Sequence, residues 1–171
     1  MLTNTPPALL PVSNVTVIAG QMLLVTNSAN DSDSPAQSLT WTLSTQPVGA
    51  TIDANGVIAW RPAISQSPST NLFKVVVTDT GIPAMSATQS FSAIVQRPAT
   101  PAFSSPGITS GTFHSVVNGS AGPDYLVYAA TNLASDWQLL LLTNPLVLPF
   151  EFTDSNATHF QQRYYRVLLG P

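Results

Sequence analysis

Short runs of β-branched and aromatic residues recur along this chain, separated by turn-forming Gly, Pro, Asn and Ser, and there is almost no helical periodicity. Runs spaced by about 8–12 residues are typical of β-sandwiches. Residues 72–78 and 90–95 alternate apolar and polar side chains, so each segment has one face on a core and one toward water. We therefore expect an all-β protein in which these two segments pair as a hairpin.

The positions of the runs predict two domains within the 171 residues. In the first half, strands are expected at 15–18, 22–26, 39–43, 51–52, 57–60, 72–79 and 87–95, the strand count of an Ig-like sandwich. Residues 98–110 are rich in Pro and Ser and are predicted to be a linker. In the second half, strands are expected at 113–117, 125–130, 137–142, 148–152 and 164–168. The prediction is one sandwich over 1–97 and a smaller one over 111–171.

The composition excludes several function classes. Charged residues are 8% of the chain, against about 25% in ordinary globular proteins. A net charge of -3, with Lys74 as the one lysine, leaves no basic stripe for nucleic acid. The chain has no cysteine, and no apolar run approaches the roughly 20 residues that span a bilayer.

A low-charge surface rich in Thr and Ser is typical of extracellular bacterial modules. The segment 1–7 has neither a basic region nor an apolar region of the kind found in signal peptides. We therefore expect an extracellular or cell-surface location within a larger parent protein, which would supply a signal peptide upstream.

Acidic residues are scarce, with eight Asp and Glu in the chain, and three of them fall at turn-like positions: Asp31, Asp33 and Asp79. Calcium takes roughly six to eight oxygen ligands in irregular geometry, so carboxylates at i and i+2 plus a third from a neighbouring strand indicate a calcium site. The alternative is an Asx turn, in which the side chains bond their own backbone without an ion.

Six segments, in order, carry a family resemblance in residues 4–95. They are Asn-Thr-Pro-Pro at 4–7, Val-Ile-Ala-Gly-Gln at 17–21, Asp-x-Asp at 31–33, Leu-Thr-Trp-Thr-Leu at 39–43, Gly-Val-Ile-Ala-Trp-Arg-Pro at 56–62 and Val-Thr-Asp-Thr-Gly-Ile-Pro at 77–83. This part of the chain resembles a cadherin-like module of the Ig or dystroglycan type found in bacterial surface proteins. The resemblance implies Ca²⁺ as cofactor, with Asp31, Asp33, Asp79 and Asn4 as ligands. The chain departs from true cadherins in lacking a Leu-Asp-Arg-Glu segment and an aspartate in its first residues.

The second half resembles a small C-terminal β module of surface proteins from environmental bacteria, for which the resemblance implies no activity. The matching residues are Gly122, Asp124, Tyr125, Val127, Ala129, Thr131, Asn132, Leu133, Asp136, Trp137, Arg163, Tyr164, Tyr165, Arg166 and Val167.

A catalytic interpretation depends on two histidines, His114 and His159. His114 and Ser115 are adjacent in a predicted strand, so their side chains point to opposite faces and cannot work together. His159 could be oriented by Asp154 or Glu151, with Ser155 as nucleophile, but no Gly-x-Ser-x-Gly elbow supports this. The alternative function is thus a small calcium-dependent hydrolase of esters or lactones.

The leading hypothesis is a calcium-binding, non-catalytic pair of modules that serves in spacing, adhesion or carbohydrate contact. Its expected partner is a surface protein or a carbohydrate, and the chain is expected to be a monomer or a weak dimer through edge strands. Trp41 and Trp60 would stack on sugars if exposed, but apolar neighbours in their strands favour core packing.

Overall fold

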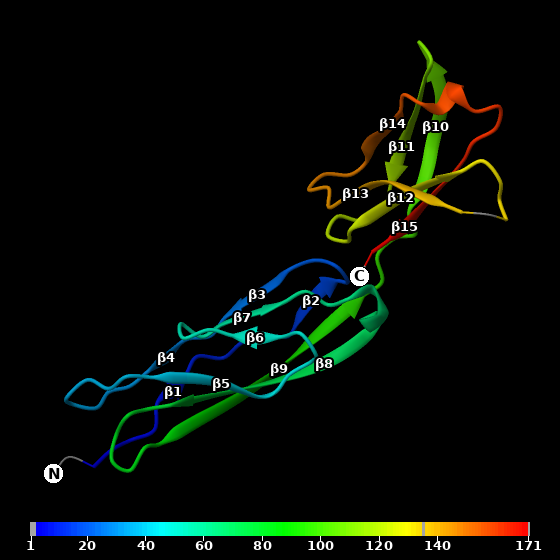
Figure 1. Cartoon of the computed structure of the whole chain (residues 1–171). Helices are drawn as coiled ribbons and strands as arrows, with labels where there is room; N and C mark the ends of the chain where they lie inside the picture. Colours follow the sequence, from blue (N-terminus) through cyan, green and yellow to red (C-terminus); the bar gives the residue numbers. More distant parts are fainter. Residues whose placement is uncertain (1–2, 135, 171) are drawn as a thin grey trace. The chain divides into compact units, whose positions relative to one another are not determined.

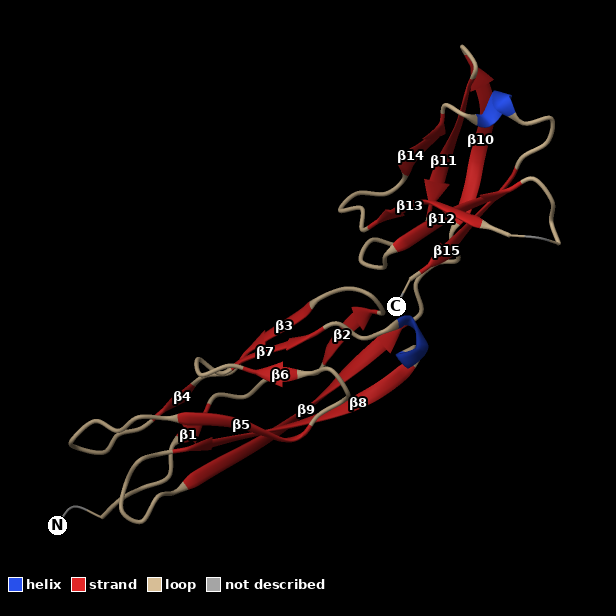
Figure 2. Cartoon of the chain, in the orientation of Figure 1, coloured by secondary structure: helices blue, strands red, loops and turns tan. Residues whose placement is uncertain are grey.

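The computed structural model describes residues 3–134 and 136–170, and it is built from strands joined by turns and two short 3₁₀ turns (Figures 1 and 2). The predicted all-β fold class is confirmed. Residues 1, 2, 135 and 171, which belong to the predicted domains, lie outside the described residues. The chain divides into two compact units: most of residues 3–96 form the first and residues 97–170 form the second. No helix in the described part is long and apolar enough to cross a membrane.

The first unit holds all seven predicted strands and two more. Its strands are β1 (Ala8–Leu9), β2 (Val15–Ile18), β3 (Leu23–Thr26), β4 (Ala29–Asn30), β5 (Thr40–Thr45), β6 (Thr51–Ile52), β7 (Val57–Trp60), β8 (Ser69–Thr78) and β9 (Ser86–Gln96), with the 3₁₀ turn η1 (Ile64–Gln66) before β8. They form a sheet of order β2-β9-β8-β5, a sheet of order β3-β7-β6, and the short pair β1-β4 (Figure 1). The strands β1 and β4 have two residues each, too few for any periodicity to reveal them.

The core of the first unit centres on the predicted hairpin of β8 and β9. The two strands pair antiparallel, with Phe73 opposite Phe91. These rings stack at 5.0 Å, and Trp60 meets Phe73 edge-on at 5.6 Å. Trp60 is 1% exposed, and its indole Nε1 donates to the Val48 carbonyl at 3.1 Å. The prediction that Trp60 packs in the core is therefore confirmed; Trp41 is partly buried.

The second unit is a smaller sandwich of two three-stranded sheets. Its strands are β10 (Ala102–Thr109), β11 (Thr112–Asn118), β12 (Tyr125–Ala130), β13 (Gln138–Thr143), β14 (Phe150–Asp154) and β15 (Tyr164–Leu169), with the 3₁₀ turn η2 (Ala157–His159) before β15. The sheet orders are β10-β11-β14 and β13-β12-β15. Between them lies a core of Val117, Tyr125, Val127 and Phe152.

The linker prediction over 98–110 is wrong for most of its length, because Ala102–Thr109 is strand β10, paired antiparallel with β11. Phe103 packs on this core, with its ring 6.0 Å from that of Phe152. The ladder is irregular between Ser104 and Gly107, so Pro106 lies at a bulge, where its missing N–H is tolerated. The segment between β9 and β10 is therefore only 97–101.

Candidate functional site

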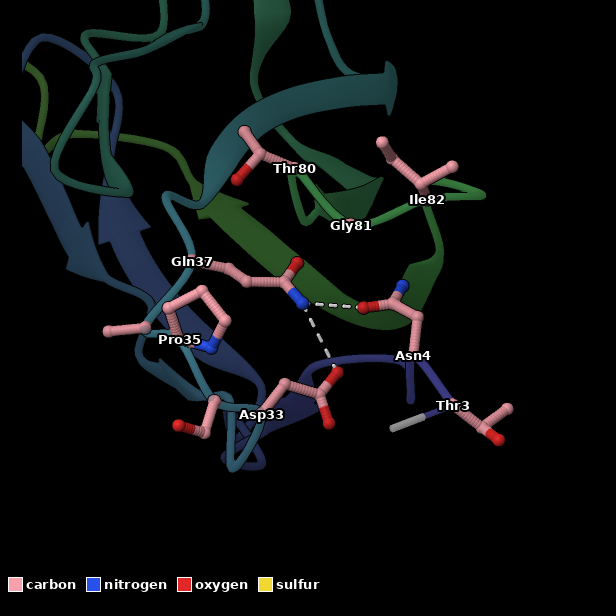
Figure 3. Close-up of a pocket in the computed structure, with 10 residues that line it drawn as sticks. Thr3, Asn4, Asp33, Pro35, Gln37, Thr80, Gly81 and Ile82 are labelled. Atoms are coloured by element: carbon pink, nitrogen blue, oxygen red, sulfur yellow. Dashed lines mark hydrogen bonds between the residues drawn. The ribbon is translucent and has the colours of Figure 1, made fainter. Parts of the chain in front are cut away.

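Three segments far apart in sequence meet at one pole of the first unit: residues 3–5, the loop after β4, and the loop between β8 and β9. Pairing of β1 with β4, with Ala8 opposite Asn30, brings the chain before β1 beside the Asp-x-Asp turn. The three segments enclose a pocket of about 330 Å³, lined by residues that include Asn4, Asp33, Gln37 and Gly81 (Figure 3). We call this region the pole site.

Asp79 lies at the end of β8 and organises the loop behind it. Its carboxylate is buried, and its Oδ1 accepts hydrogen bonds from the backbone N–H groups of Gly81 at 3.0 Å and Met85 at 2.8 Å. Its Oδ2 accepts a third bond, from Asn4 Nδ2 at 3.1 Å. Burial by itself raises the pKa of Asp79, but these three bonds outweigh burial and hold the pKa below the ordinary value. Asp79 is therefore a charged residue that fixes the conformation of the loop between β8 and β9.

Asp33 ties the start of the chain to the Asp-x-Asp turn. Its Oδ2 accepts from the backbone N–H of Thr5 at 2.8 Å, and its Oδ1 accepts from the Thr5 hydroxyl at 2.9 Å. Asp31 Oδ1 accepts from the backbone N–H of Asp33 at 2.9 Å, which is the Asx turn expected as the alternative to a metal. This turn uses only one oxygen of Asp31, so it leaves the other available.

Gln37, a residue missed by the sequence reasoning, lies between two of the predicted ligands (Figure 3). Its Nε2 donates to Asn4 Oδ1 at 2.5 Å and to Asp33 Oδ2 at 3.3 Å. The one sequence signal is its place four residues after Asp33 in the same loop, and that spacing alone does not predict its contacts. Only the tertiary structure distinguishes Gln37.

Two oxygens at this pole are buried without a hydrogen-bond donor among the described residues: Asp31 Oδ2 and Gln37 Oε1. A buried acceptor without a partner costs about 1–3 kcal/mol, so such atoms indicate a missing partner. Carboxylate and amide oxygens are the ligand types that calcium accepts. These carboxylate and amide oxygens are therefore suitable ligands for a hard cation.

The structure does not assemble the three aspartates into a carboxylate cage. Within residues 3–134 and 136–170, no three or more His, Cys, Asp or Glu side chains lie close enough together to hold a metal ion. Asp79 Oδ1 accepts hydrogen bonds from the β8–β9 loop and its Oδ2 accepts one from Asn4, as described above. The other side-chain oxygens at this pole belong to Asn4, Asp31, Asp33 and Gln37, a mixed set of carboxylates and amides, and those of Asn4 and Asp33 already accept hydrogen bonds.

The two histidines of the second unit lie on different elements, His114 on β11 and His159 in η2. Ser115 is buried and donates to the Ser104 carbonyl at 2.9 Å, while His114 is on the other face of β11, with its Nδ1 3.5 Å from Glu151 Oε1. The expected opposition of His114 and Ser115 is thus present. His159 is exposed in η2.

Asp154, the predicted orienter of His159, has other partners. Arg163 Nε forms an ion pair with Asp154 Oδ2 at 2.7 Å, and the Tyr165 hydroxyl donates to the same oxygen at 3.0 Å. Burial of the ring, with the hydrogen bond to Asp154 and its charge, raises the pKa of Tyr165 to about 12. Asp154 therefore holds the start of β15 in place through Arg163 and Tyr165.

The paired sheets and this pole define the class of the chain as an Ig-like β-sandwich protein. The chain belongs to the family described as "Putative Ig domain", whose model matches residues 6–96. No curated protein matches the chain. The resemblance of the second half to a C-terminal surface module stays a prediction.

Solved cadherin structures are similar to the chain in fold. Mouse cadherin-23 domains EC22–24 share 18% identity with a TM-score of 0.47, covering 73% of this chain and 49% of that one. Drosophila N-cadherin EC1–4 shares 20% identity with a TM-score of 0.43, covering 53% of this chain and 24% of that one. Protocadherin GammaB4 shares 13% identity with a TM-score of 0.45, covering 68% and 32%. The chain thus spans less than half the length of these three solved chains.

Proposed function

We propose that the chain is a calcium-binding, non-catalytic pair of β-sandwich modules from a secreted or cell-surface bacterial protein, and that it serves in adhesion or spacing. Membership of the Ig-domain family and the low-charge surface support the proposal of a secreted or cell-surface protein. Calcium at the pole site would join the start of the chain to two loops of the first unit. A domain stiffened in this way holds a binding surface at a fixed distance from its parent.

The observation that carries the calcium proposal is the pair of buried oxygens without donors, Asp31 Oδ2 and Gln37 Oε1. A cation bound to Asp31 Oδ2 would remove the cost of burying that oxygen. The two ends of an amide have nearly the same shape, so a half-turn of the Gln37 amide exchanges its oxygen and nitrogen. Its oxygen would then face Asn4 Oδ1 and Asp33 Oδ2, where Nε2 now donates to both. The oxygens of Gln37, Asn4 and Asp33 would then lie together and, with Asp31 Oδ2, would supply four of the roughly six to eight oxygens that calcium takes.

Asp79 supports the site without being a ligand. Its bonds to Gly81 and Met85 fix the β8–β9 loop, and its bond to Asn4 fixes the amide that faces Gln37. The proposed ligands are therefore Asn4, Asp31, Asp33 and Gln37, with Asp79 in a positioning role. This revises the set implied by the resemblance.

The test is thermal unfolding with calcium and with chelator, for the wild type and for Asp31→Ala and Gln37→Ala. A ligand bound only by the native state stabilises it by about 2.7 kcal/mol at 100 times Kd, which is about 10–20 °C in Tm for a domain of this size. We expect this rise in the wild type and its loss in both variants. Asp53→Ala is the matched control, because Asp53 also accepts from turn N–H groups, at 2.9 Å from Asn55 and 2.8 Å from Val57, away from the pole. It should keep the full calcium response.

A wild-type Tm that is the same in calcium and chelator would refute the calcium proposal and leave Asp31 and Asp33 as turn formers. An equal loss of response in Asp53→Ala would show that the variants act through general destabilisation. Turnover of p-nitrophenyl esters by the wild type, abolished by His159→Ala, would contradict the non-catalytic part.

A further inference from the structure

The sheet β13-β12-β15 of the second unit has one face on the core and one face turned away from it. Tyr125 and Val127 of its central strand β12 are fully buried in the core. Side chains alternate along a strand, so Leu126 and Tyr128 point outward. Residues that lie opposite one another in a ladder share a face, so the register assigns the outward side chains of β13 and β15 as well.

Leucine side chains form a row across this outward face. Leu126 pairs with Leu142 of β13 on one side and with Leu168 of β15 on the other. Leu142 is 61% exposed and Leu168 is 45% exposed. Leu139, which pairs with Tyr128 beside this row, is 49% exposed. Single exposed leucines are ordinary, but neighbouring ones that form a continuous apolar surface mark an interaction site.

Arg166 is the one charged residue in the three strands of this sheet. It lies opposite Tyr128 on the outward face. The carbon of its guanidinium is 4.9 Å from the centre of the Tyr128 ring and 4.4 Å from that of Trp137, the residue before β13. Both rings lie on the β12 and β13 side of β15, so the guanidinium extends over the sheet and not past its edge. The four leucines with Tyr128, Trp137 and Arg166 are called the outer patch below.

The Arg166 guanidinium has no carboxylate partner and no hydrogen-bond acceptor within residues 3–134 and 136–170. Arg163, three positions earlier, differs in this respect, because it pairs with Asp154 at 2.7 Å. A guanidinium carries five N–H donors in one plane, in a fork that matches the two oxygens of a carboxylate. Arg166 is therefore a cation held in place by two rings, with its donors available to an acidic ligand.

We propose that the outer patch docks a segment of another protein that presents an acidic side chain among apolar ones. The carboxylate would pair with Arg166, and the apolar side chains would cover the leucine row. Charge complementarity requires the acid, because burying Arg166 without a partner would be costly. The proposal goes beyond the proposed function, since it concerns the second unit and does not depend on the calcium site.

The residue types of the outer patch favour a protein over a carbohydrate. Trp, Tyr and Arg supply much of the binding energy at protein interfaces, and the patch places Trp137, Tyr128 and Arg166 together. The leucine row has no side-chain group that could bond the hydroxyls of a sugar, and hydroxyls buried without a partner are costly. The carboxylate of an acidic sugar could reach Arg166, but its ring would then cover leucines.

A second copy of the chain does not supply the missing acid through the same face. In a two-fold contact each patch meets its own copy, so both Arg166 side chains would enter one interface. The three strands contain no Asp or Glu that could pair with them. A partner with an acidic residue of its own meets the requirement.

The test begins with a phage-displayed library of random peptides, selected on the immobilised full chain and counter-selected on Leu142→Ser. The counter-selection directs the recovered peptides to the outer patch without choosing their charge. We expect the recovered sequences to share an Asp or Glu with apolar residues on both sides. A synthetic peptide with the shared sequence is then titrated into the full chain by calorimetry, beside a copy in which the acid is replaced by its amide.

Two changes test the ion pair from its two ends. Arg166→Gln in the chain, or the amide in the peptide, should each weaken binding by about tenfold or more, because a charge-assisted hydrogen bond is lost. The two changes together should weaken it little further, since they remove the same pair. The amide peptide is measured on the wild-type chain, so a defect in folding cannot explain its loss.

The chain offers a matched control for each substitution. Arg97→Gln removes the same charge from an exposed arginine outside this sheet. Leu24→Ser replaces a leucine of β3 in the first unit that is 65% exposed, close to the 61% of Leu142. Both variants should bind the peptide as the wild type does. Binding should also be the same in calcium and in chelator, which separates this result from that at the pole site.

Several results would overturn the proposal. One is that no peptide survives the counter-selection, and another is that the recovered peptides lack an acid or bind Arg166→Gln as tightly as the wild type. Self-association of the chain that Leu142→Ser abolishes would assign the outer patch to a second copy. Displacement of the peptide by polygalacturonate, with binding of that polymer lost in Arg166→Gln, would assign it to an acidic carbohydrate.

Discussion

Asp79 is a buried carboxylate that holds three donors, one of them on Asn4, 75 positions away in the chain. Its role as a turn residue follows from the Asp-Thr-Gly sequence, which favours such a loop. Its bond to Asn4 depends on the β1–β4 pairing, which the sequence does not reveal. The same holds for Gln37, whose two contacts exist only when the three segments meet.

The lowered pKa of Asp79 makes the stability of the first unit depend on pH. The folded state binds the proton more weakly than the unfolded state, so this contribution is complete above the unfolded value of 3.8 and is lost as pH falls through the lower folded value. We expect Asp79→Asn to reduce stability at neutral pH and to flatten its decline below about pH 4. Urea unfolding of the variant and the wild type, from neutral pH to below about pH 4, measures the stability and its dependence on pH. An unchanged pH slope in the variant would contradict the role given to Asp79.

At the scale of elements, two glycines with similar positive φ allow two effects of an alanine substitution to be compared: backbone strain alone, and strain together with a steric clash at Cβ. Gly56, before β7, has φ +79°, and a Cβ there would lie 2.9 Å from the Asn27 carbonyl oxygen and 2.9 Å from Trp41. Gly49 has φ +86° with nothing within 4 Å of its Cβ position. A left-handed conformation costs a side chain roughly 1–2 kcal/mol, and overpacking costs about 1–3 kcal/mol more.

Gly56→Ala should therefore destabilise the first unit by about 2–5 kcal/mol, and Gly49→Ala by only about 1–2 kcal/mol. Denaturant unfolding of the two variants beside the wild type measures the difference. Equal losses would show that strain alone decides both positions.

The strands themselves were largely predictable. The expected bounds of β2, β6, β7 and β12 agree with the structure, because these runs are apolar or β-branched and end at turn residues. The strand β10 was missed, because Pro106 and the serines around it resemble a linker, while the ladder and the contacts of Phe103 that make it a strand are non-local.

At the scale of the whole molecule, each unit has a core of its own. Phe73 and Trp60 belong to the first, and Tyr125 and Phe152 to the second. Phe73→Ala should destabilise the first unit by about 3–5 kcal/mol, because it removes a fully buried ring that meets two others.

Hydrogen exchange resolved by residue measures that effect. The amides of β8 and β9 should lose protection in Phe73→Ala, and those of β11 and β12 should keep it. Phe152→Ala is the reciprocal variant and should reverse the pattern. Loss of protection in both units from either change would mean that they unfold as one cooperative body.

The sequence alone determined the fold class, most strands and the Ig-like resemblance, because alternation, β-branching and turn residues act over a few neighbouring positions. It also marked Asp31, Asp33, Asp79 and Asn4 as belonging together. Tertiary structure decided what each does: Asp79 fixes a loop, Gln37 joins Asn4 to Asp33, and Asp31 retains a buried oxygen without a donor. Hydrogen-bond partners and burial depend on contacts between distant segments, and those contacts form only when the sheets assemble.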